Sequence, residues 1–161
     1  MLVDGYSSVV FNVAYRMTGD QDASEDVAQA VFLKAFEKLD GYDSRFRFFS
    51  WIYRIAINES LNYLKQNRRN EDLDPMLPSG DKQPDERCAE AELHSKIQEA
   101  LMELDHDYRA VIIMRHYANY SYKEIGEIMG VPEKTVKSRL FSARQILRDI
   151  LAKRGILSHD S

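Results

Sequence analysis

The segment SYKEIGEIMGVPEKTVKSR, residues 121–139, reads as two short helices joined by a glycine turn. Ser121 and Glu124 have the spacing of a capping box, in which each side chain satisfies a backbone N–H that the first helical turn leaves open. Gly126 is small enough for a close helix crossing, and Gly130 can adopt the left-handed conformation that ends a helix. The segment therefore predicts a helix-turn-helix whose first helix begins at Ser121.

The second helix of this motif carries a buried stripe and a basic surface. Pro132 suits its first turn, and apolar residues three or four positions apart form the stripe: Val136, Leu140, Ala143 and Leu147. In a helix-turn-helix, the N-terminal part of the second helix enters the major groove, where hydroxyl, amide and guanidinium groups read base edges. The residues predicted to contact duplex DNA are Lys134, Lys137, Ser138, Arg139, Phe141, Ser142 and Arg144. The alternative is an ordinary helical hairpin whose cations only keep it soluble.

Composition limits the classes of protein to which the chain can belong. It has 161 residues, 44% of them hydrophobic and 30% charged, so it is globular at least in part. Its single cysteine, Cys88, excludes an internal disulfide, and no residues stand at metal-ligand spacing, so we expect no metal and no cofactor. The first residues lack a signal-peptide pattern, and the apolar runs are too short to span a bilayer. These features predict a cytoplasmic protein without membrane insertion.

A proline-rich acidic segment divides the chain. Residues 70–86, NEDLDPMLPSGDKQPDE, contain three of the four prolines and many acids, which is typical of a linker. Helical periodicity appears on both sides of it. The predicted fold class is all-α, with two small helical domains, residues 1–69 and 89–161, joined by a flexible acidic linker, residues 70–88. The residues expected to form a core that braces the reading helix are Leu93, Ile97, Leu101, Leu104, Val111, Ile112 and Met114.

Residues 20–40 predict a helix with one buried face and one acidic face. The buried face is expected to hold Val27, Val31, Ala35 and Leu39, which recur every fourth residue. The opposite face carries Asp22, Glu25, Asp26, Gln29 and Leu33. An acidic face is usually just solvated, but acids around an exposed leucine are more typical of a docking surface for a basic protein partner.

Residues 46–69 predict a helix with a polar stripe. Its members are three or four positions apart and share one helix face: Trp51, Arg54, Asn58, Asn62, Lys65 and Arg69. The residues expected to point into the core are Ile52, Ile55, Ala56 and Tyr63. One tryptophan, two amides and three cations are poor core material. They suit nucleic acid, with cations on phosphates, amides on base edges and an aromatic plane for unstacked bases.

Three blocks of the sequence together resemble the extracytoplasmic-function (ECF) group of the sigma-70 family, which are two-domain bacterial transcription initiation factors. In chain order the blocks are YRMTGDQDASEDVAQAVFLKAF, FFSWIYRIAINESLNYL and YRAVIIMRHYANYSYKEIGEIMGVPEKTVKSRLFSAR. The resemblance covers nearly the whole chain. It implies a factor that binds RNA polymerase core and directs it to promoters by recognising the −10 and −35 elements and melting DNA. Catalysis belongs to the polymerase, and this chain is expected to have no catalytic residues.

The resemblance also implies roles for the residue sets above. Asp26, Gln29 and Leu33 would contact the clamp helices of the polymerase β′ subunit, and the C-terminal domain would contact the β flap. The polar stripe would recognise and melt the −10 element, and residues 41–50 would form a pocket for a flipped base. The helix-turn-helix would face the −35 element. The implied partners are therefore RNA polymerase core, promoter DNA as duplex and as single strand, and an anti-sigma factor.

Two other classes of protein fit the sequence less well. A stand-alone regulator would use the helix-turn-helix as a homodimer on a site with two-fold symmetry, and the polar stripe would then have no use. An enzyme is less favoured still. The four histidines are isolated, Cys88 has no identifiable base, and no phosphate-binding glycine loop is present.

Overall fold

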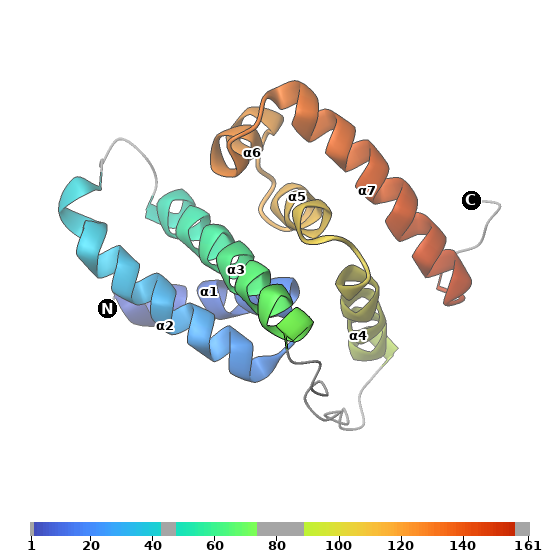
Figure 1. Cartoon of the computed structure of the whole chain (residues 1–161), viewed down its shortest axis with the longest axis horizontal. Helices are drawn as coiled ribbons and strands as arrows, with labels where there is room; N and C mark the ends of the chain where they lie inside the picture. Colours follow the sequence, from blue (N-terminus) through green and yellow to red (C-terminus); the bar gives the residue numbers. More distant parts are fainter. Residues whose placement is uncertain (1, 43–47, 74–88, 157–161) are drawn as a thin grey trace.

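The computed structural model describes residues 2–42, 48–73 and 89–156, and the regular elements in these residues are all helical (Figure 1). In chain order they are α1 (Leu2–Thr18), α2 (Gln21–Lys38), the short 3₁₀ helix η1 (Leu39–Gly41), α3 (Phe48–Leu73), α4 (Ala89–Met102), α5 (His106–His116), α6 (Tyr122–Met129) and α7 (Glu133–Lys153). The prediction of an all-α fold is confirmed. Helix α3 includes the first residues of the predicted linker 70–88, and residues 74–88 lie outside the described part.

Helices α1, α2 and α3 pack together as the N-terminal domain (Figure 1). Gly19 follows α1 with a φ of +71°, and Asp20 then caps α2 by accepting a hydrogen bond from the backbone N–H two residues on. The predicted stripe of α2 is buried at Val27, Val31 and Ala35. The residues of α1 and α3 that complete this part of the core are Val10, Val13, Ala14, Met17, Ile52, Ala56, Ile57 and Leu61.

The helix-turn-helix of the C-terminal domain forms as predicted. Ser121 Oγ accepts a hydrogen bond from the Glu124 N–H at 3.1 Å, and the Ser121 N–H donates to Glu124 Oε1 at 2.8 Å. Gly130 has a φ of +72° and ends α6 in the left-handed conformation. A Cβ at Gly126 would lie 2.6 Å from the carbonyl oxygen of Val131. The turn therefore folds back onto α6 so closely that only glycine fits.

Two predicted core residues are exposed, Leu39 to 47% and Leu93 to 43%, so the prediction is wrong at these positions. Leu39 begins η1, where the tighter winding of a 3₁₀ helix turns its side chain away from the buried stripe of α2. Leu93 lies in the first half of α4, where residues 92–96 are all exposed. The buried side of α4 begins only at Ile97, which is half-buried.

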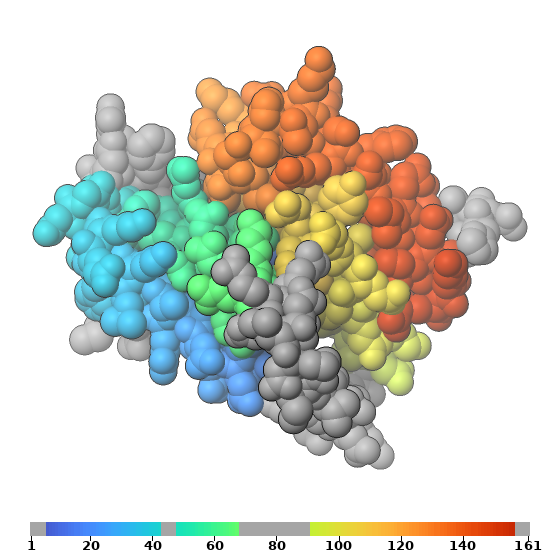
Figure 2. Space-filling view, in the orientation of Figure 1, coloured from blue at the N-terminus to red at the C-terminus, as the bar shows by residue number. Residues whose placement is uncertain are grey.

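The two domains pack against each other around one continuous core. Helix α1 contacts α4 and α5, and α3 contacts α5 and α6. Helix α5 is central to this arrangement, since residues 109–114 are all buried. On the face shown in Figure 2, the surface of α3 meets the surface of the C-terminal domain directly. The sequence predicted two domains joined by a linker, and it gave no indication of this packing.

Replacing Gly126 with alanine is expected to destabilise the protein. Alanine gains up to about 1 kcal/mol over glycine in a helix interior, but overpacking against a neighbour that cannot move costs about 1–3 kcal/mol. The neighbour here is the backbone oxygen of Val131, so the cost should exceed the gain. Urea denaturation followed by circular dichroism measures the free energy of unfolding.

Gly41→Ala is the matched control, because nothing lies within 4 Å of a Cβ at Gly41. Its free energy of unfolding should stay within about 0.5 kcal/mol of the wild-type value. If Gly126→Ala were as stable as the wild type or more stable, the close approach between α6 and the turn would be contradicted.

Candidate nucleic-acid interface

Helix α7 presents an open face that fits the predicted duplex reader. Its buried stripe holds Val136, Leu140 and Ala143, with Leu147 half-buried, and Pro132 is the N-cap just before the helix rather than part of its first turn. The exposed members of the predicted reader are Lys134, Lys137, Ser138 and Phe141, and the half-buried ones are Arg139, Ser142 and Arg144. The four exposed residues are named the reader face below.

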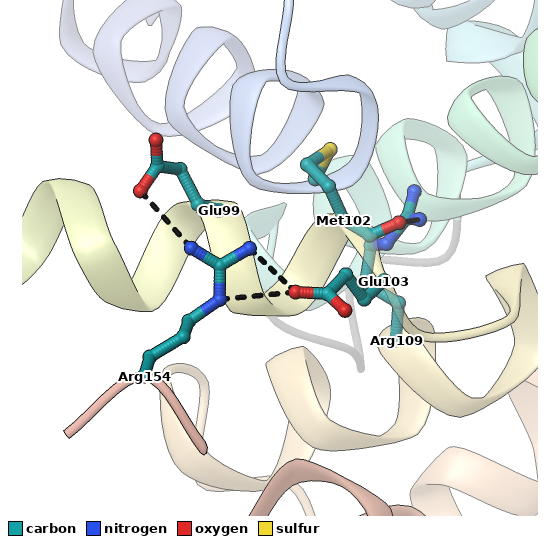
Figure 3. A network of polar contacts seen from close by, with 5 residues as sticks. All are labelled: Glu99, Met102, Glu103, Arg109 and Arg154. Carbon is teal, nitrogen blue, oxygen red and sulfur yellow. Dashed lines mark hydrogen bonds and ion pairs between the residues drawn. The ribbon is translucent and has the colours of Figure 1, made fainter. Parts of the chain in front are cut away.

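Two cations, one in the middle of α7 and one just beyond its end, are engaged with other parts of the protein. Arg144 donates from Nε to Nε2 of His116 at 3.3 Å. Arg154, just beyond α7, donates from Nε to Oε2 of Glu103 at 3.0 Å and from Nη1 to Oε2 of Glu99 at 3.4 Å (Figure 3). This arginine fork ties the C-terminal end of α7 to α4. The helix is thus held firmly at the end away from the turn.

His116 supports the reader helix, a role that sequence analysis missed when it treated the histidines as isolated. It is the last residue of α5, and 28 positions separate it from Arg144, so spacing along the chain could not reveal the pair. Burial, with help from the cations of Arg144 and Arg115, lowers the pKa of His116 below its usual 6.5. The neutral imidazole can accept the Arg144 hydrogen bond through Nε2.

The polar stripe of α3 lies on one helix face, as predicted. Its exposed members are Arg54, Asn62 and Lys65, its half-buried ones are Trp51 and Asn58, and the side chain of Arg69 lies outside the described residues. The ring of Trp51 packs against Tyr42 and Phe48, with centroids 5.0 and 5.4 Å apart. Trp51 is therefore one member of an aromatic cluster rather than a free plane. Residues 43–47, part of the predicted pocket for a flipped base, lie outside the described residues.

Part of the α3 stripe borders the C-terminal domain, although Arg54, Asn62 and Lys65 remain exposed. Arg54 donates from Nη2 to the backbone carbonyl of Glu127 in α6 at 3.2 Å. Further along, a pocket of about 180 Å³ joins the two domains; its lining includes Asn58, Asn62 and Lys65 of α3, and Ile128, Met129 and Arg139 of the helix-turn-helix. The two predicted nucleic-acid surfaces therefore meet at this pocket, and Arg139 belongs to it rather than to the reader face.

Helix α2 presents a third surface, with polar groups in its first half and apolar groups in its second half. Asp26 and Gln29 are exposed, as predicted, and Leu33 is 65% exposed. Sequence analysis missed Phe36, which is 66% exposed. Phe36 follows Leu33 by three residues and so shares its helix face, a spacing that could have revealed it. Asp26, Gln29, Leu33 and Phe36 are named the docking face below.

The described residues contain no group of three or more His, Cys, Asp or Glu side chains arranged to hold a metal ion. No described helix combines the length and the apolar composition that crossing a bilayer requires. A pocket of about 400 Å³ between α2 and α3 has charged walls, where Lys34 and Glu59 form an ion pair.

Comparison with known proteins identifies the class of both domains. The family model of Sigma-70 region 2 matches residues 2–70, and that of Sigma-70 region 4 matches residues 94–147. The chain is 30% identical over 159 residues to the ECF RNA polymerase sigma factor SigW of Bacillus subtilis, a match that covers 91% of this chain and 85% of SigW. It is 33% identical over 159 residues to the ECF RNA polymerase sigma-E factor of Escherichia coli, covering 91% and 83%.

Solved structures share the fold. The sigma factor RpoE, in complex with the anti-sigma factor NepR from Bartonella quintana, aligns with a TM-score of 0.77 at 23% identity, covering 92% of this chain and 93% of RpoE. CnrH, in complex with the cytosolic domain of CnrY, aligns with a TM-score of 0.67 at 23% identity, covering 94% and 86%.

The chain therefore belongs to the ECF sigma factors of the sigma-70 family. Its function is promoter-specific transcription initiation with RNA polymerase, and the stand-alone dimeric regulator is not favoured. Members of this family are transcription initiation factors rather than enzymes. The resemblance described from the sequence is confirmed.

Lowering the pH from about 7.5 to about 5.5 should destabilise the wild type more than His116→Gln. Folding lowers the pKa of His116, so between that lowered pKa and about 6.5 the unfolded chain binds more protons than the native one. Stability is therefore lost as the pH falls through this window. Protonation also removes the lone pair that accepts the Arg144 hydrogen bond. Urea denaturation at both pH values measures the effect.

His94→Gln serves as the control, because His94 is exposed on α4. It should lose as much stability on acidification as the wild type. A His116→Gln variant that behaved like the His94 variant would show that this histidine does not carry the pH dependence.

Proposed function

We propose that three helix surfaces of this sigma factor have separate roles in polymerase binding and promoter recognition. The docking face of α2 binds the β′ clamp helices of core polymerase, the α3 stripe recognises and melts the −10 element, and the reader face of α7 recognises the −35 element. The observation that carries the proposal is that three chemically different residue sets lie on three separate helices. Those helices follow the order of Sigma-70 regions 2 and 4.

The docking face has the composition of a protein-binding surface. Leu33 and Phe36 are about two-thirds exposed, at 65% and 66%, and fully burying such a side chain is worth about 1.5–3 kcal/mol. Asp26 and Gln29 supply polar contacts beside these apolar anchors. A partner helix pair with basic residues around an apolar groove would match this face.

The α3 stripe has the chemistry of a single-strand binder. Arg54 and Lys65 can neutralise phosphates, and Asn58 and Asn62 can hydrogen-bond to exposed base edges. An aromatic contact such as the cluster around Trp51 offers is worth about 1–3 kcal/mol per stacked base. Because these contacts form with unpaired bases, they favour the melted state of the −10 element over the duplex.

The reader face has the chemistry of a duplex reader. Lys134 and Lys137 can contact phosphates, Ser138 can contact a base edge, and the ring of Phe141, 67% exposed, can contact a thymine methyl group. A single module of this kind buries only about 600–1,000 Å² of protein surface on DNA and should bind weakly alone. Polymerase would hold both readers at a fixed spacing, so that the second contact becomes effectively intramolecular.

Further partners follow by analogy. RpoE and CnrH were solved in complex with NepR and with the cytosolic domain of CnrY, respectively. An anti-sigma factor is proposed for this chain as well, with the apolar part of the docking face as its target. The C-terminal domain would contact the β flap, and all of these encounters would take place in the cytoplasm.

The double variant Leu33→Ala with Phe36→Ala should bind core polymerase at least about 100-fold more weakly, because the lost burial of each apolar anchor costs about 1.5–3 kcal/mol. Runoff transcription from a promoter library, with core polymerase and increasing amounts of factor, measures this loss. Tyr15→Ala is the matched control, since Tyr15 is a large exposed side chain on α1, and it should transcribe like the wild type. Unchanged transcription by the double variant would rule out the docking face.

Phe141→Ala and Asn62→Ala should affect different steps of initiation by the holoenzyme. Phe141→Ala should weaken the first complex with duplex DNA several-fold, because it removes the apolar contact with a thymine methyl group, and Asn62→Ala should lower the fraction of bound promoters that melt. Gel shift measures the first step, and permanganate reactivity of unpaired thymines measures the second. Gln145→Ala, exposed on α7, should change neither. Equal losses at both steps in both variants would contradict this division of roles.

A further inference from the structure

A polar groove runs between α2 and α3, which lie side by side in Figure 1. It consists of two adjoining pockets, of about 400 and about 300 Å³, and Lys34, Glu59 and Asn62 line both. One edge of the groove is formed by every fourth residue of α2: Asp26, Ala30, Lys34 and Lys38. At 1.5 Å of rise per residue this edge is about 18 Å long, whereas one nucleotide of a DNA strand advances about 3.4 Å along the duplex axis. The groove can therefore hold more than one nucleotide.

The two ends of the groove differ in charge. Asp26, at one end, belongs to the docking face, and Lys34 and Lys38 line the other end. Lys38 is exposed, and four residues further on stands Tyr42, whose ring packs against Trp51 with centroids 5.0 Å apart. The cationic end of the groove thus adjoins the aromatic cluster of the α3 stripe.

The amides of the α3 stripe lie beside these cations. Asn58 lines the smaller pocket together with Lys34 and Lys38, and Asn62 lines both pockets. A row of cations next to base-binding groups and aromatic rings is the arrangement by which proteins follow the backbone of a single strand. The groove therefore extends the single-strand surface of α3 onto α2, a helix to which sequence analysis gave only a docking role.

The carboxylate of Glu59 lies in this groove and forms an ion pair with the ammonium group of Lys34. The side chain of Glu59 is 13% exposed, and that of Lys34 is 43% exposed. A pair so close to solvent adds little to stability, and α2 and α3 already share an apolar core that includes Val31 and Ile52. Carboxylate and phosphate both bind an ammonium group through anionic oxygens. Glu59 thus occupies the position beside Lys34 that a phosphate would take.

We propose that the groove between α2 and α3 is part of the single-strand site, in which Lys34 and Lys38 bind backbone phosphates and a phosphate displaces the carboxylate of Glu59 from Lys34. The inference rests on the proposed role of the α3 stripe and adds a second wall to that site. It also gives Glu59 a function. The carboxylate competes with the DNA backbone, so it weakens the grip on any single strand that does not gain from the base contacts of Asn58 and Asn62.

The first test measures the affinity of the full-length protein for a fluorescent random-sequence single strand by anisotropy, at several salt concentrations. Glu59→Gln keeps the shape of the side chain and removes its charge. The variant should bind about three- to fivefold more tightly, which is what an ion pair near the surface is worth. The slope of log affinity against log salt should steepen by about 0.7, the value of one additional phosphate contact on a single strand.

The matched control is Glu92→Gln, which removes the same charge from an exposed position on α4. It should change neither the affinity nor the slope. A gain in Glu59→Gln that is no larger than the gain in Glu92→Gln would overturn the proposal, because it would show only an effect of net charge.

Lys34→Met tests whether Glu59 acts through Lys34. In this background, Glu59→Gln should no longer raise the affinity, because no cation remains for the carboxylate to occupy. The same three- to fivefold gain with and without Lys34 would contradict the exchange of carboxylate for phosphate.

Lys38→Gln keeps the proposal testable if the Glu59 variant does not fold, because Lys38 is exposed. It should bind the single strand about threefold more weakly and lower the salt slope by about 0.7. Lys96→Gln, an exposed cation on α4, is its control and should bind like the wild type. Equal affinities for the Lys38 and Lys96 variants would remove Lys38 from the site.

The holoenzyme provides a second measurement that does not depend on how tightly the free chain binds. Permanganate reactivity should show a larger melted fraction with Glu59→Gln than with the wild type, and an unchanged fraction would overturn the proposal. Asn62→Ala separates this inference from the proposed function. If Asn62→Ala lowers the melted fraction and Glu59→Gln does not raise it, only the groove is overturned. If Asn62→Ala melts promoters like the wild type, the proposed role of the α3 stripe fails.

Discussion

The buried guanidinium of Arg109 links the two domains by bonding to backbone carbonyls of both. An unpaired buried charge costs several kcal/mol, and Arg109 avoids this cost by donating to carbonyls at two helix ends, where the helix dipoles also favour a cation. The carbonyls of Leu101, Met102 and Leu104 belong to its own domain, so they remain its partners when the domains separate. A separation of the domains would therefore not leave this charge without partners.

The shared core explains how two domains this small support ordered helices. A bundle of about 70 residues buries a modest fraction of its surface when it folds alone. Here the buried residues 110–114 of α5 give both domains a common apolar surface. The fit between the end of α1 and α4 is close, since a side chain at Gly19 would collide with Met102. Any partner that separates the domains must therefore supply new contacts for the apolar surface that α1 and α3 lose.

How far the sequence predicts this structure depends on the distance over which each interaction acts. The capping box at Ser121 and the left-handed Gly130 lie within a turn or two of the residues they affect. The local sequence pattern was therefore sufficient to predict where α6 begins and ends. Periodicity along one helix could not show that Leu93 has no neighbour to cover it. The partners of Arg109 are backbone carbonyls, which every residue has, so no residue pattern marks them. His116 and Arg144 meet only because α5 packs on α7.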